Sequence, residues 1–485
     1  MTPEKKAGKR TGAVKSTPKT APKTTPKTAP KPRPAEISLA RKAAFHILLA
    51  VERGASHSDD LLRGQAVNAL SAPDRNLATA LVLGVLRWQI RLDHQFRALL
   101  ARPNARLDPE ILIALRLGAF QLLHMDRIPA RAVLSESVEL AKQSGHRFAS
   151  GLVNAVLRKL AVAPRFERAE ESLAELALAQ AHPAWMVERW TGFFGPQAVR
   201  EICRHGQIQP VLAVRLAAPA VEAELAAAGV VLEAGQLLTA ARTVVAGDIT
   251  ATPAFREGRL RLQDEGSQLV AELACAHPSQ KVNSVLDACA APGGKTLILA
   301  ERNPEARLLA LEVSAARIED LRKRLAVLGD RVECRLADAA ALVEDAAFDL
   351  ALVDVPCSGT GTLGRNPEIR HRLRPEDFAR QAERQRAILA AALRSVRPGG
   401  CVVYSTCSLE PEENEQVVAA VLAADATALQ VSLAARIEAL RGAGILTSEG
   451  AERLLGALTP EGCLRLLPGK FKTDGFFIAL IERVA

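Results

Sequence analysis

Two cysteines in the C-terminal half of the chain, Cys357 and Cys407, each follow an apolar stretch and lie in a polar loop, within LVDVPCSGTG and VVYSTCSLEPEENE. Functional residues concentrate in such loops, and a thiolate is a soft, strong nucleophile. A thiolate that adds to carbon 6 of a pyrimidine breaks the aromaticity of the ring, and carbon 5 can then attack an activated methyl group. Asp354 lies three residues before Cys357, where an acid could protonate or hydrogen-bond ring nitrogen 3. These residues predict methylation of a pyrimidine through a covalent intermediate.

A nucleoside site is indicated by the segment VLDACAAPGGKT and by acids that follow the next two predicted strands. Pro292, Gly293 and Gly294 form a tight loop that opens a helix, and glycine lets a ligand approach the backbone closely. Glu312 ends the second strand, where an acid binds ribose hydroxyls in nucleotide-binding folds. Asp338 follows the third strand, where it could meet an adenine ring. Either acid alone could simply cap a helix, but together they predict a nucleoside ligand.

Regular alternation of strands and helices from residue 263 onward predicts an α/β fold that positions these loops. Continuous apolar strands separated by helices indicate a mostly parallel, Rossmann-like sheet that is covered on both faces. The chain ends with CLRLLPGKFKTDGFFIALIERVA, which predicts an antiparallel hairpin at one sheet edge. The predicted parallel strands are Ser284–Cys289, Leu308–Glu312, Val332–Leu336, Phe348–Asp354 and Cys401–Ser405.

Three segments of different composition precede this catalytic domain, which we assign to residues 263–485. Residues 1–36 are rich in Pro, Thr, Ala and Lys, so we expect a disordered or locally extended basic tail. Residues 37–165 show helical periodicity throughout and predict an all-α domain, with N-caps at Asp74 and Asp108. Residues 166–262 mix short strand-like runs with helices, and we expect a small α/β connecting domain there.

The distribution of charge and the number of cysteines indicate which partners the protein could bind and in which cellular compartment it would function. The chain has 63 basic and 54 acidic residues, but residues 1–35 hold ten Lys and Arg and one acid, so the remainder is balanced. A Lys-rich tail suits a polyanion such as nucleic acid, and a solvated extension that aids solubility is an equal alternative. Eight cysteines without a C-x-x-C pair predict neither a disulfide framework nor a metal site. Because no apolar stretch reaches membrane-spanning length and no secretory signal is visible, we expect a cytoplasmic protein that does not enter a membrane.

The motifs around Cys289, Cys357 and Cys407 resemble those of the RNA cytosine-5 methyltransferase family. The helical segments DRNLATALVLGVLRWQIRLD, ILIALRLGAFQLLHMDRIPARAVLSESVELAK and GLVNAVLRKL resemble the RNA-binding antitermination factor NusB. The combination is similar to bacterial enzymes that methylate cytosine in small-subunit (16S) ribosomal RNA. The similarity covers about residues 38–485, which is nearly everything except the tail.

The resemblance implies a role for each matching residue of the motifs. Cys407 would be the nucleophile on carbon 6, Cys357 would assist release of the product, and Asp354 would lie between the cofactor and the target base. Lys295 could contact either Asp354 or RNA. The S-adenosyl-L-methionine site would be lined by Cys289, Ala290, Ala291, Pro292, Gly293, Gly294 and Lys295.

The resemblance also assigns the two strand-end acids. Glu312 would hold the ribose, with Glu in place of the commoner Asp, and Asp338 would hold the adenine, within LADAA rather than a Gly-Asp-Gly type of turn. The implied partner is small-subunit ribosomal RNA, with a monomer as the default state.

Three alternatives to this function remain open. A transfer RNA substrate would use the same chemistry. A non-catalytic RNA-binding ribosome assembly factor would be expected to lose one of the two motif cysteines or the PGGK segment, and this chain keeps all of them. A methyltransferase acting on an exocyclic nitrogen needs no thiol and typically has an Asn/Asp-Pro-Pro-aromatic loop, whereas this chain has Asp-Val-Pro-Cys at residues 354–357.

Overall fold

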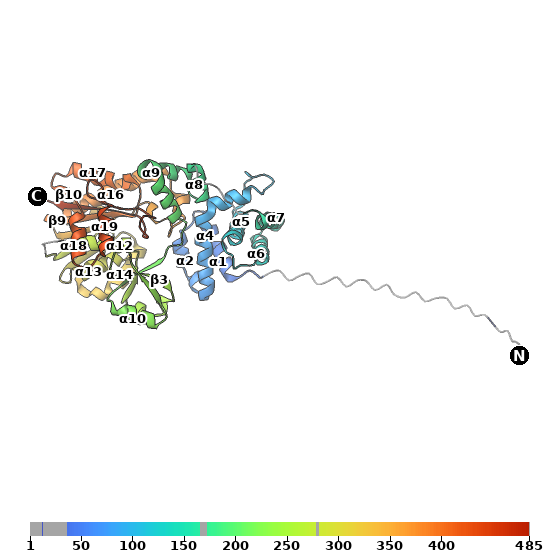
Figure 1. The fold of residues 1–485 in the computed structure, drawn as a ribbon, viewed down its shortest axis with the longest axis horizontal. Coiled ribbons are helices and arrows are strands. Elements are labelled where there is room, and N and C mark those ends of the chain that lie inside the picture. The colour runs from blue at the N-terminus through green and yellow to red at the C-terminus, as the bar shows by residue number, and fades with distance from the viewer. Residues whose placement is uncertain (1–11, 13–35, 165–171, 278–280, 485) are drawn as a thin grey trace.

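The computed structural model describes residues 12, 36–164, 172–277 and 281–484. The predicted basic tail, apart from residues 12 and 36, lies outside the described residues. The described chain forms a helical part, then a small sheet, then a large sheet with helices on both faces (Figure 1). Among these described residues, no helix is both long enough and apolar enough to cross a bilayer.

The helical part has one core, because the apolar residues of its helices recur at helical spacing and face one another. Helix α4 packs so closely on α5 at Gly84 that a Cβ there would lie 2.0 Å from the Phe120 ring, so only glycine fits. Its α-helices are α1 (Leu39–Glu52), α2 (Ser58–Leu62), α3 (Gln65–Asn68), α4 (Ala72–Arg97), α5 (Pro109–His124), α6 (Ala130–Gln143) and α7 (Ser150–Val162).

One of the two predicted N-caps is correct. Asp108 occupies the N-cap position of α5, with Pro109 as the first helical residue. The prediction for Asp74 is wrong, because α4 begins at Ala72 and its cap is Ser71, whose hydroxyl accepts a hydrogen bond from the Asp74 N–H at 3.3 Å. Pro73 suits the first turn of a helix, so the helix starts before it.

A four-stranded antiparallel sheet follows, with strand order β2-β3-β1-β4. Two helices precede it, and α9 bends where Gly195, at φ 78°, interrupts the helical backbone. The elements are α8 (Leu173–Ala179), α9 (Ala184–His205), β1 (Leu212–Leu216), α10 (Ala220–Ala227), β2 (Val231–Ala234), β3 (Ala241–Ala246), α11 (Pro253–Arg256) and β4 (Leu260–Leu262).

The large sheet has strand order β10-β12-β9-β8-β5-β6-β7, and β11 pairs separately with β12. The strands β9, β8, β5, β6 and β7 are parallel, which confirms the predicted α/β class. Its strands are β5 (Ser284–Asp287), β6 (Arg307–Glu312), β7 (Val332–Leu336), β8 (Phe348–Asp354), β9 (Val396–Thr406), β10 (Ala428–Val431), β11 (Leu464–Leu466) and β12 (Phe476–Arg483).

The C-terminal strands β11 and β12 form an antiparallel pair, as predicted, but β12 is not an edge strand. It lies between β9 on one side and β10 and β11 on the other. Strand β10 was not predicted, because its sequence ALQV has only four residues and shows no clear alternation of apolar and polar side chains.

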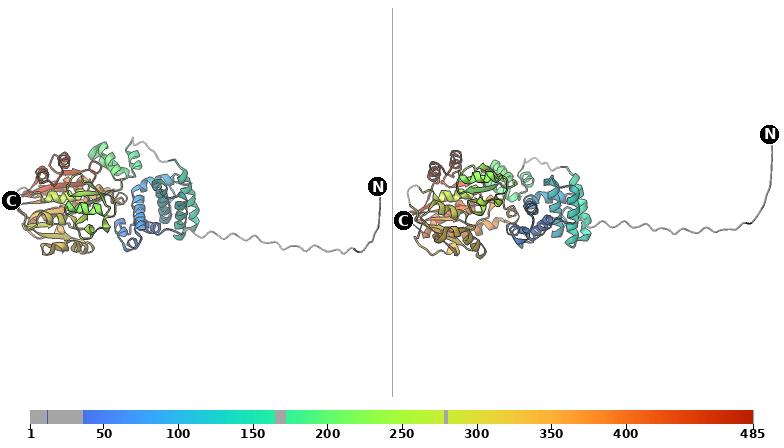
Figure 2. Two further views of the ribbon diagram at one scale, coloured as in Figure 1. Left: turned by 60° about the horizontal axis from the view of Figure 1, so that its bottom comes forward. Right: turned by 90° about the horizontal axis from the view of Figure 1, so that it is seen from below.

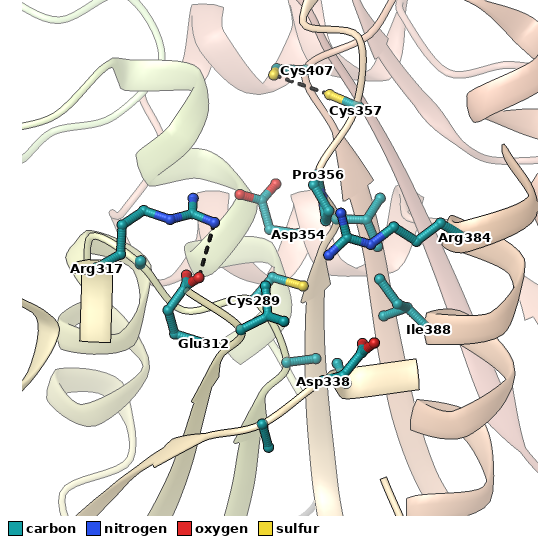
Figure 3. Close-up of a pocket in the computed structure, with 16 residues that line it drawn as sticks. Cys289, Glu312, Arg317, Asp338, Asp354, Pro356, Cys357, Arg384, Ile388 and Cys407 are labelled. Carbon is teal, nitrogen blue, oxygen red and sulfur yellow. Dashed lines mark hydrogen bonds and ion pairs between the residues drawn. The ribbon is translucent and has the colours of Figure 1, made fainter. Parts of the chain in front are cut away.

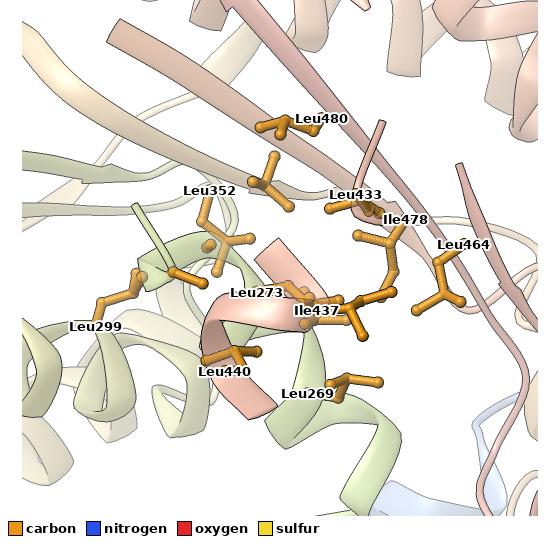
Figure 4. Close-up of a cluster of buried hydrophobic side chains, with 14 of the residues drawn as sticks. Leu269, Leu273, Leu299, Leu352, Leu433, Ile437, Leu440, Leu464, Ile478 and Leu480 are labelled. Carbon is orange, nitrogen blue, oxygen red and sulfur yellow. The ribbon is translucent and has the colours of Figure 1, made fainter. Parts of the chain in front are cut away.

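Helices cover both faces of the large sheet (Figures 1 and 2). One face packs on α12, α13 and α18 through leucines and isoleucines such as Leu273, Leu299 and Ile437 (Figure 4). The other face packs on α16 and α17. These helices are α12 (Glu265–Cys275), α13 (Gly294–Arg302), α14 (Ala315–Leu325), α15 (Ile369–Arg372), α16 (Pro375–Ser395), α17 (Glu415–Ala424), α18 (Ala434–Gly442) and α19 (Ser448–Leu455).

The buried side chain of Arg370 joins the helical part to the large-sheet part. Its pKa is lowered to about 9, first by burial and then by the nearby Arg87, so it remains charged at neutral pH. Two residues before Arg370, the Glu368 carboxylate accepts a hydrogen bond of 2.8 Å from the Ser58 N–H at the start of α2. Arg370 donates at 3.1–3.3 Å to the carbonyl oxygens of Arg87, Ala181, Gly206 and Leu363.

We expect Arg370→Met to lower the free energy of unfolding by at least about 3 kcal/mol, because buried carbonyls that lose a charged donor each cost about 1–3 kcal/mol. That change corresponds to a fall in Tm of roughly 3 °C for a chain of this length, measurable by circular dichroism. Arg380→Met is the control, since Arg380 is exposed on α16 and, among the described residues, pairs with Asp377 alone. Equal melting of the two variants would show that the Arg370 contacts do not stabilise the fold.

Candidate functional site

A pocket of about 200 Å³ opens at the carboxyl ends of the parallel strands (Figure 3). Parallel strands place the loops that follow them at one edge, which is where open α/β sheets bind ligands. The loops after β5, β6, β7, β8 and β9 all contribute to it. Its lining includes these residues that the sequence predicted: Cys289, Ala291, Glu312, Asp338, Asp354, Cys357 and Cys407.

The two predicted catalytic thiols lie next to each other, with 3.3 Å between the sulfur atoms of Cys357 and Cys407 (Figure 3). Cys357 follows β8 and Cys407 follows β9, and these strands pair in parallel up to Asp354 and Ser405. The pKa of the Cys357 thiol lies well above its ordinary value because of its hydrogen bond with Cys407, its burial and the negative charge of Glu413. Cys357 therefore keeps its proton, and this protonated thiol lies beside the sulfur of Cys407.

Asp354 is fixed by two hydrogen bonds at the end of β8. Lys295 Nζ lies 2.6 Å from its Oδ2, and Ser405 Oγ donates to its Oδ1 at 2.7 Å. Burial alone would lower the pKa of Lys295, but the carboxylates of Asp354 and Asp287 outweigh burial and raise it. Lys295 therefore stays positively charged, and it makes the predicted contact to Asp354.

The loop of residues 289–295 turns sharply between β5 and α13. Gly293 has φ +96°, a conformation that favours glycine, and the Ala291–Pro292 peptide is cis. Below the loop, Thr296 donates to the buried Asp287 at 2.7 Å, while burial raises the Asp287 pKa to about 6. Cys289 and Ala291 line both the main pocket and a smaller one of about 80 Å³. The smaller pocket is also lined by Ala290, Pro292, Gly294 and Lys295.

The two strand-end acids differ in their surroundings. Glu312 is buried, and its Oε1 accepts from the Ser314 N–H at 2.7 Å and pairs with Arg317 at 2.9 Å. None of the described residues donates to its Oε2. Asp338 is exposed, and its Oδ1 accepts from the Ala340 N–H at 3.0 Å, which caps a short 3-10 helix. Asp338 thus caps a helix and also lines the pocket.

Four residues that shape this site were not predicted from the sequence. Arg317, in the first turn of α14, pairs with Glu312, and Ser405 fixes Asp354. Arg384 and Ile388 of α16 reach the pocket from the other side (Figure 3). Their spacing of four residues puts both on one face of a helix, but only the structure shows that this face meets the pocket.

Comparison with known proteins places the chain in a family. The model of the 16S rRNA methyltransferases RsmB/F matches residues 274–482, and the NusB family model matches residues 38–162. The chain is 33% identical to "Probable ribosomal RNA small subunit methyltransferase B" of Bacillus subtilis, over 91% of this chain and 98% of that protein. It is also 33% identical to "Ribosomal RNA small subunit methyltransferase B" of Pseudomonas putida, over 84% of this chain and 95% of that protein.

A solved structure, that of PH0851, has the same fold. It covers 93% of this chain and 100% of its own, with a TM-score of 0.73 and 24% identity. The two family matches and the relatives confirm the resemblance, both for the catalytic part and for the NusB-like helical part. The chain therefore belongs to the RsmB/F family of 16S rRNA methyltransferases, which have the fold of S-adenosylmethionine-dependent methyltransferases.

Proposed function

We propose that this enzyme methylates carbon 5 of one specific cytosine in 16S ribosomal RNA, with S-adenosyl-L-methionine as methyl donor and Cys407 as covalent nucleophile. The observation that carries the proposal is the thiol pair, 3.3 Å apart, at the rim of the pocket and beside Asp354. Methylation at an exocyclic nitrogen would leave this pair without a use. The 16S target is supported by the names of the relatives.

The pocket residues fit S-adenosyl-L-methionine. Glu312 presents an acceptor oxygen, Oε2, that none of the described residues occupies, which suits a ribose hydroxyl. Asp338 and Ile388 would lie against the adenine, and Cys289 and Ala291 of the tight loop would border the methionine end. When bound, this cofactor supplies an electrophilic methyl group.

The protein's own groups then perform the nucleophilic and proton-transfer steps. Cys407 gives up its thiol proton and forms a bond from its Sγ to carbon 6, ring nitrogen 3 takes up a proton as charge develops there, and the new N–H donates a hydrogen bond to the Asp354 carboxylate. Carbon 5 becomes nucleophilic and gains the methyl group. Loss of the carbon 5 proton to a base then breaks the bond to Cys407 Sγ and restores the ring. Cys357, whose thiol stays protonated beside Cys407, would assist this release.

The target cytosine has to leave its base stack to reach Cys407, because the thiol is partly buried and lines a pocket. We therefore expect a single-stranded or flipped nucleotide as substrate. The NusB-like helical part would supply RNA contacts away from the thiols.

Glu312→Gln is expected to weaken binding of S-adenosyl-L-methionine about tenfold, because a charge-assisted hydrogen bond to a ribose hydroxyl contributes roughly 1.5 kcal/mol. Glutamine can still accept the hydrogen bond from the Ser314 N–H, so the start of α14 is preserved. Isothermal titration with the cofactor measures the effect. Glu319→Gln, on the exposed face of α14, is the matched control, and equal affinity of both variants would contradict the role of Glu312.

A methylation assay separates the proposal from its alternatives. The protein is incubated with labelled cofactor and protein-free 16S rRNA, with transfer RNA in parallel, and the RNA is digested to nucleosides. Label in 5-methylcytosine from 16S rRNA alone is the expected result. Label from transfer RNA alone would overturn the target, and label in a base methylated on nitrogen would overturn the mechanism.

A further inference from the structure

A fully buried polar network lies directly behind the two thiols. Each cysteine is followed by a serine, Ser358 after Cys357 and Ser408 after Cys407, and both serines are buried. The two hydroxyl oxygens lie 3.1 Å apart. The network therefore repeats, one residue further along each loop, the contact that the sulfur atoms make.

The centre of this network is the carboxylate of Glu413, whose side chain has no exposed surface. Its Oε1 accepts from the Ser358 N–H at 2.8 Å and from Gln385 Nε2 at 3.0 Å. Its Oε2 accepts from the hydroxyls of both Ser358 and Ser408. One side chain thus binds both cysteine loops at the residue that follows each thiol.

The backbone of Glu413 is itself held in place. Tyr404 of β9 donates its hydroxyl to the Glu413 carbonyl oxygen at 2.6 Å, and Tyr404 is fully buried in the sheet. A buried carboxylate is tolerated only when donors satisfy it. The described donors to the Glu413 carboxylate come from the two loops and from α16, so its burial is compensated only while both loops are in position.

We propose that Glu413 is a positioning residue that fixes the spacing of the Cys357 and Cys407 thiols by clamping Ser358 and Ser408. Its part in catalysis rests on the proposed function of the two cysteines. The clamp itself does not, because it predicts how the two sulfur atoms react with each other.

The spacing of the two thiols can be tested by measuring how fast diamide, an azo compound, oxidises them to a disulfide. Two thiols form a disulfide, and the two electrons and two protons that they lose reduce the N=N bond to a hydrazine. Groups held in contact react as if at very high concentration, so loosened loops should cross-link more slowly. The rate of the Cys357–Cys407 disulfide is followed by alkylation of the remaining thiols and peptide mass spectrometry.

Three variants make the test specific. Glu413→Ala removes the clamp and should slow the cross-link at least tenfold. Glu413→Gln keeps the shape and can still bridge the loops without charge, so it should react within about threefold of the native protein. Glu410→Ala is the matched control, because Glu410 is equally buried in the same loop but its carboxylate binds Arg189 and Trp190 instead.

The outcomes decide the proposal in either direction. A slow Glu413→Ala variant beside normal Glu413→Gln and Glu410→Ala variants supports the clamp. Equal rates in all of them, or equal slowing by Glu410→Ala, overturn it. If Glu413→Ala fails to fold by circular dichroism, the double variant Ser358→Ala, Ser408→Ala takes its place, with the same tenfold slowing expected and an unchanged rate overturning the clamp.

Catalysis provides a second readout. With the clamp lost, Glu413→Ala should lower kcat and leave the KM for S-adenosyl-L-methionine within about twofold, and Glu413→Gln should restore most of kcat. An increase in that KM with kcat unchanged would contradict a role in thiol placement. If the native protein shows no methylation at all, the proposed function fails while the cross-linking result still tests the clamp.

Discussion

Replacing Cys407 with Ala is expected to lower methyl transfer to 16S rRNA by about 10⁴-fold or more, because loss of a covalent nucleophile removes the reaction path itself. Carbon 5 of cytosine is a poor nucleophile until a group adds at carbon 6. Binding of S-adenosyl-L-methionine should be unchanged within about threefold, since the proposed ribose-binding residue Glu312 lies on another strand, β6. Single-turnover methylation and cofactor titration measure the two effects.

Cys401→Ala is the matched control for that variant. Cys401 is a buried cysteine in the middle of the same strand, β9, its sulfur accepts a hydrogen bond from Arg436, and it is not among the residues that line the pocket. It should retain methylation close to the native level. Residual activity of Cys407→Ala above about a hundredth of native would show that Cys407 is not the nucleophile.

Cys357→Ala is expected to have a different effect, which is the accumulation of a covalent complex between protein and RNA. Cys407 can still add to carbon 6, and the methyl group can still be transferred, but release slows because the adjacent protonated thiol is lost. A band shifted by the mass of the RNA should appear on a denaturing gel, with up to one RNA per protein. The native protein should show little of this band.

The double variant Cys357→Ala, Cys407→Ala is the control for the adduct. Its shifted band should vanish, because the attachment is through Cys407. A Cys357→Ala protein that turns over normally, with no shifted band, would contradict the role of Cys357 in release. A band that persists in the double variant would mean that another residue forms the bond.

Local patterns predicted the catalytic fold, and they predicted which strand ends would carry the residues that line its pocket. Strands β7 and β8 begin and end where the sequence places them. For β8 the reason is that a buried parallel strand is a nearly continuous apolar run with a polar loop at its end. Cys357, Cys407, Asp354 and Glu312 all follow strands of one parallel sheet, so topology alone brings them to one edge.

Other parts of the site depend on contacts that no local pattern reveals. Arg384 approaches the pocket only because α16 packs across β8 and β9, and Arg370 finds its carbonyl partners in segments hundreds of residues apart. Glu413 looks like one acid among several in LEPEENE. Its burial between two serines appears only when both loops are folded together.

The most direct test of the central claim is peptide mapping of the adduct. The Cys357→Ala protein is incubated with 16S rRNA and S-adenosyl-L-methionine, digested with nuclease and protease, and the modified peptide is sequenced by mass spectrometry. The Cys407 sulfur in that peptide should carry one cytidine nucleotide, and this nucleotide should have gained one methyl group. An adduct on any other residue, or a cytidine adduct on Cys407 that never gains the methyl group, would contradict the proposed covalent mechanism.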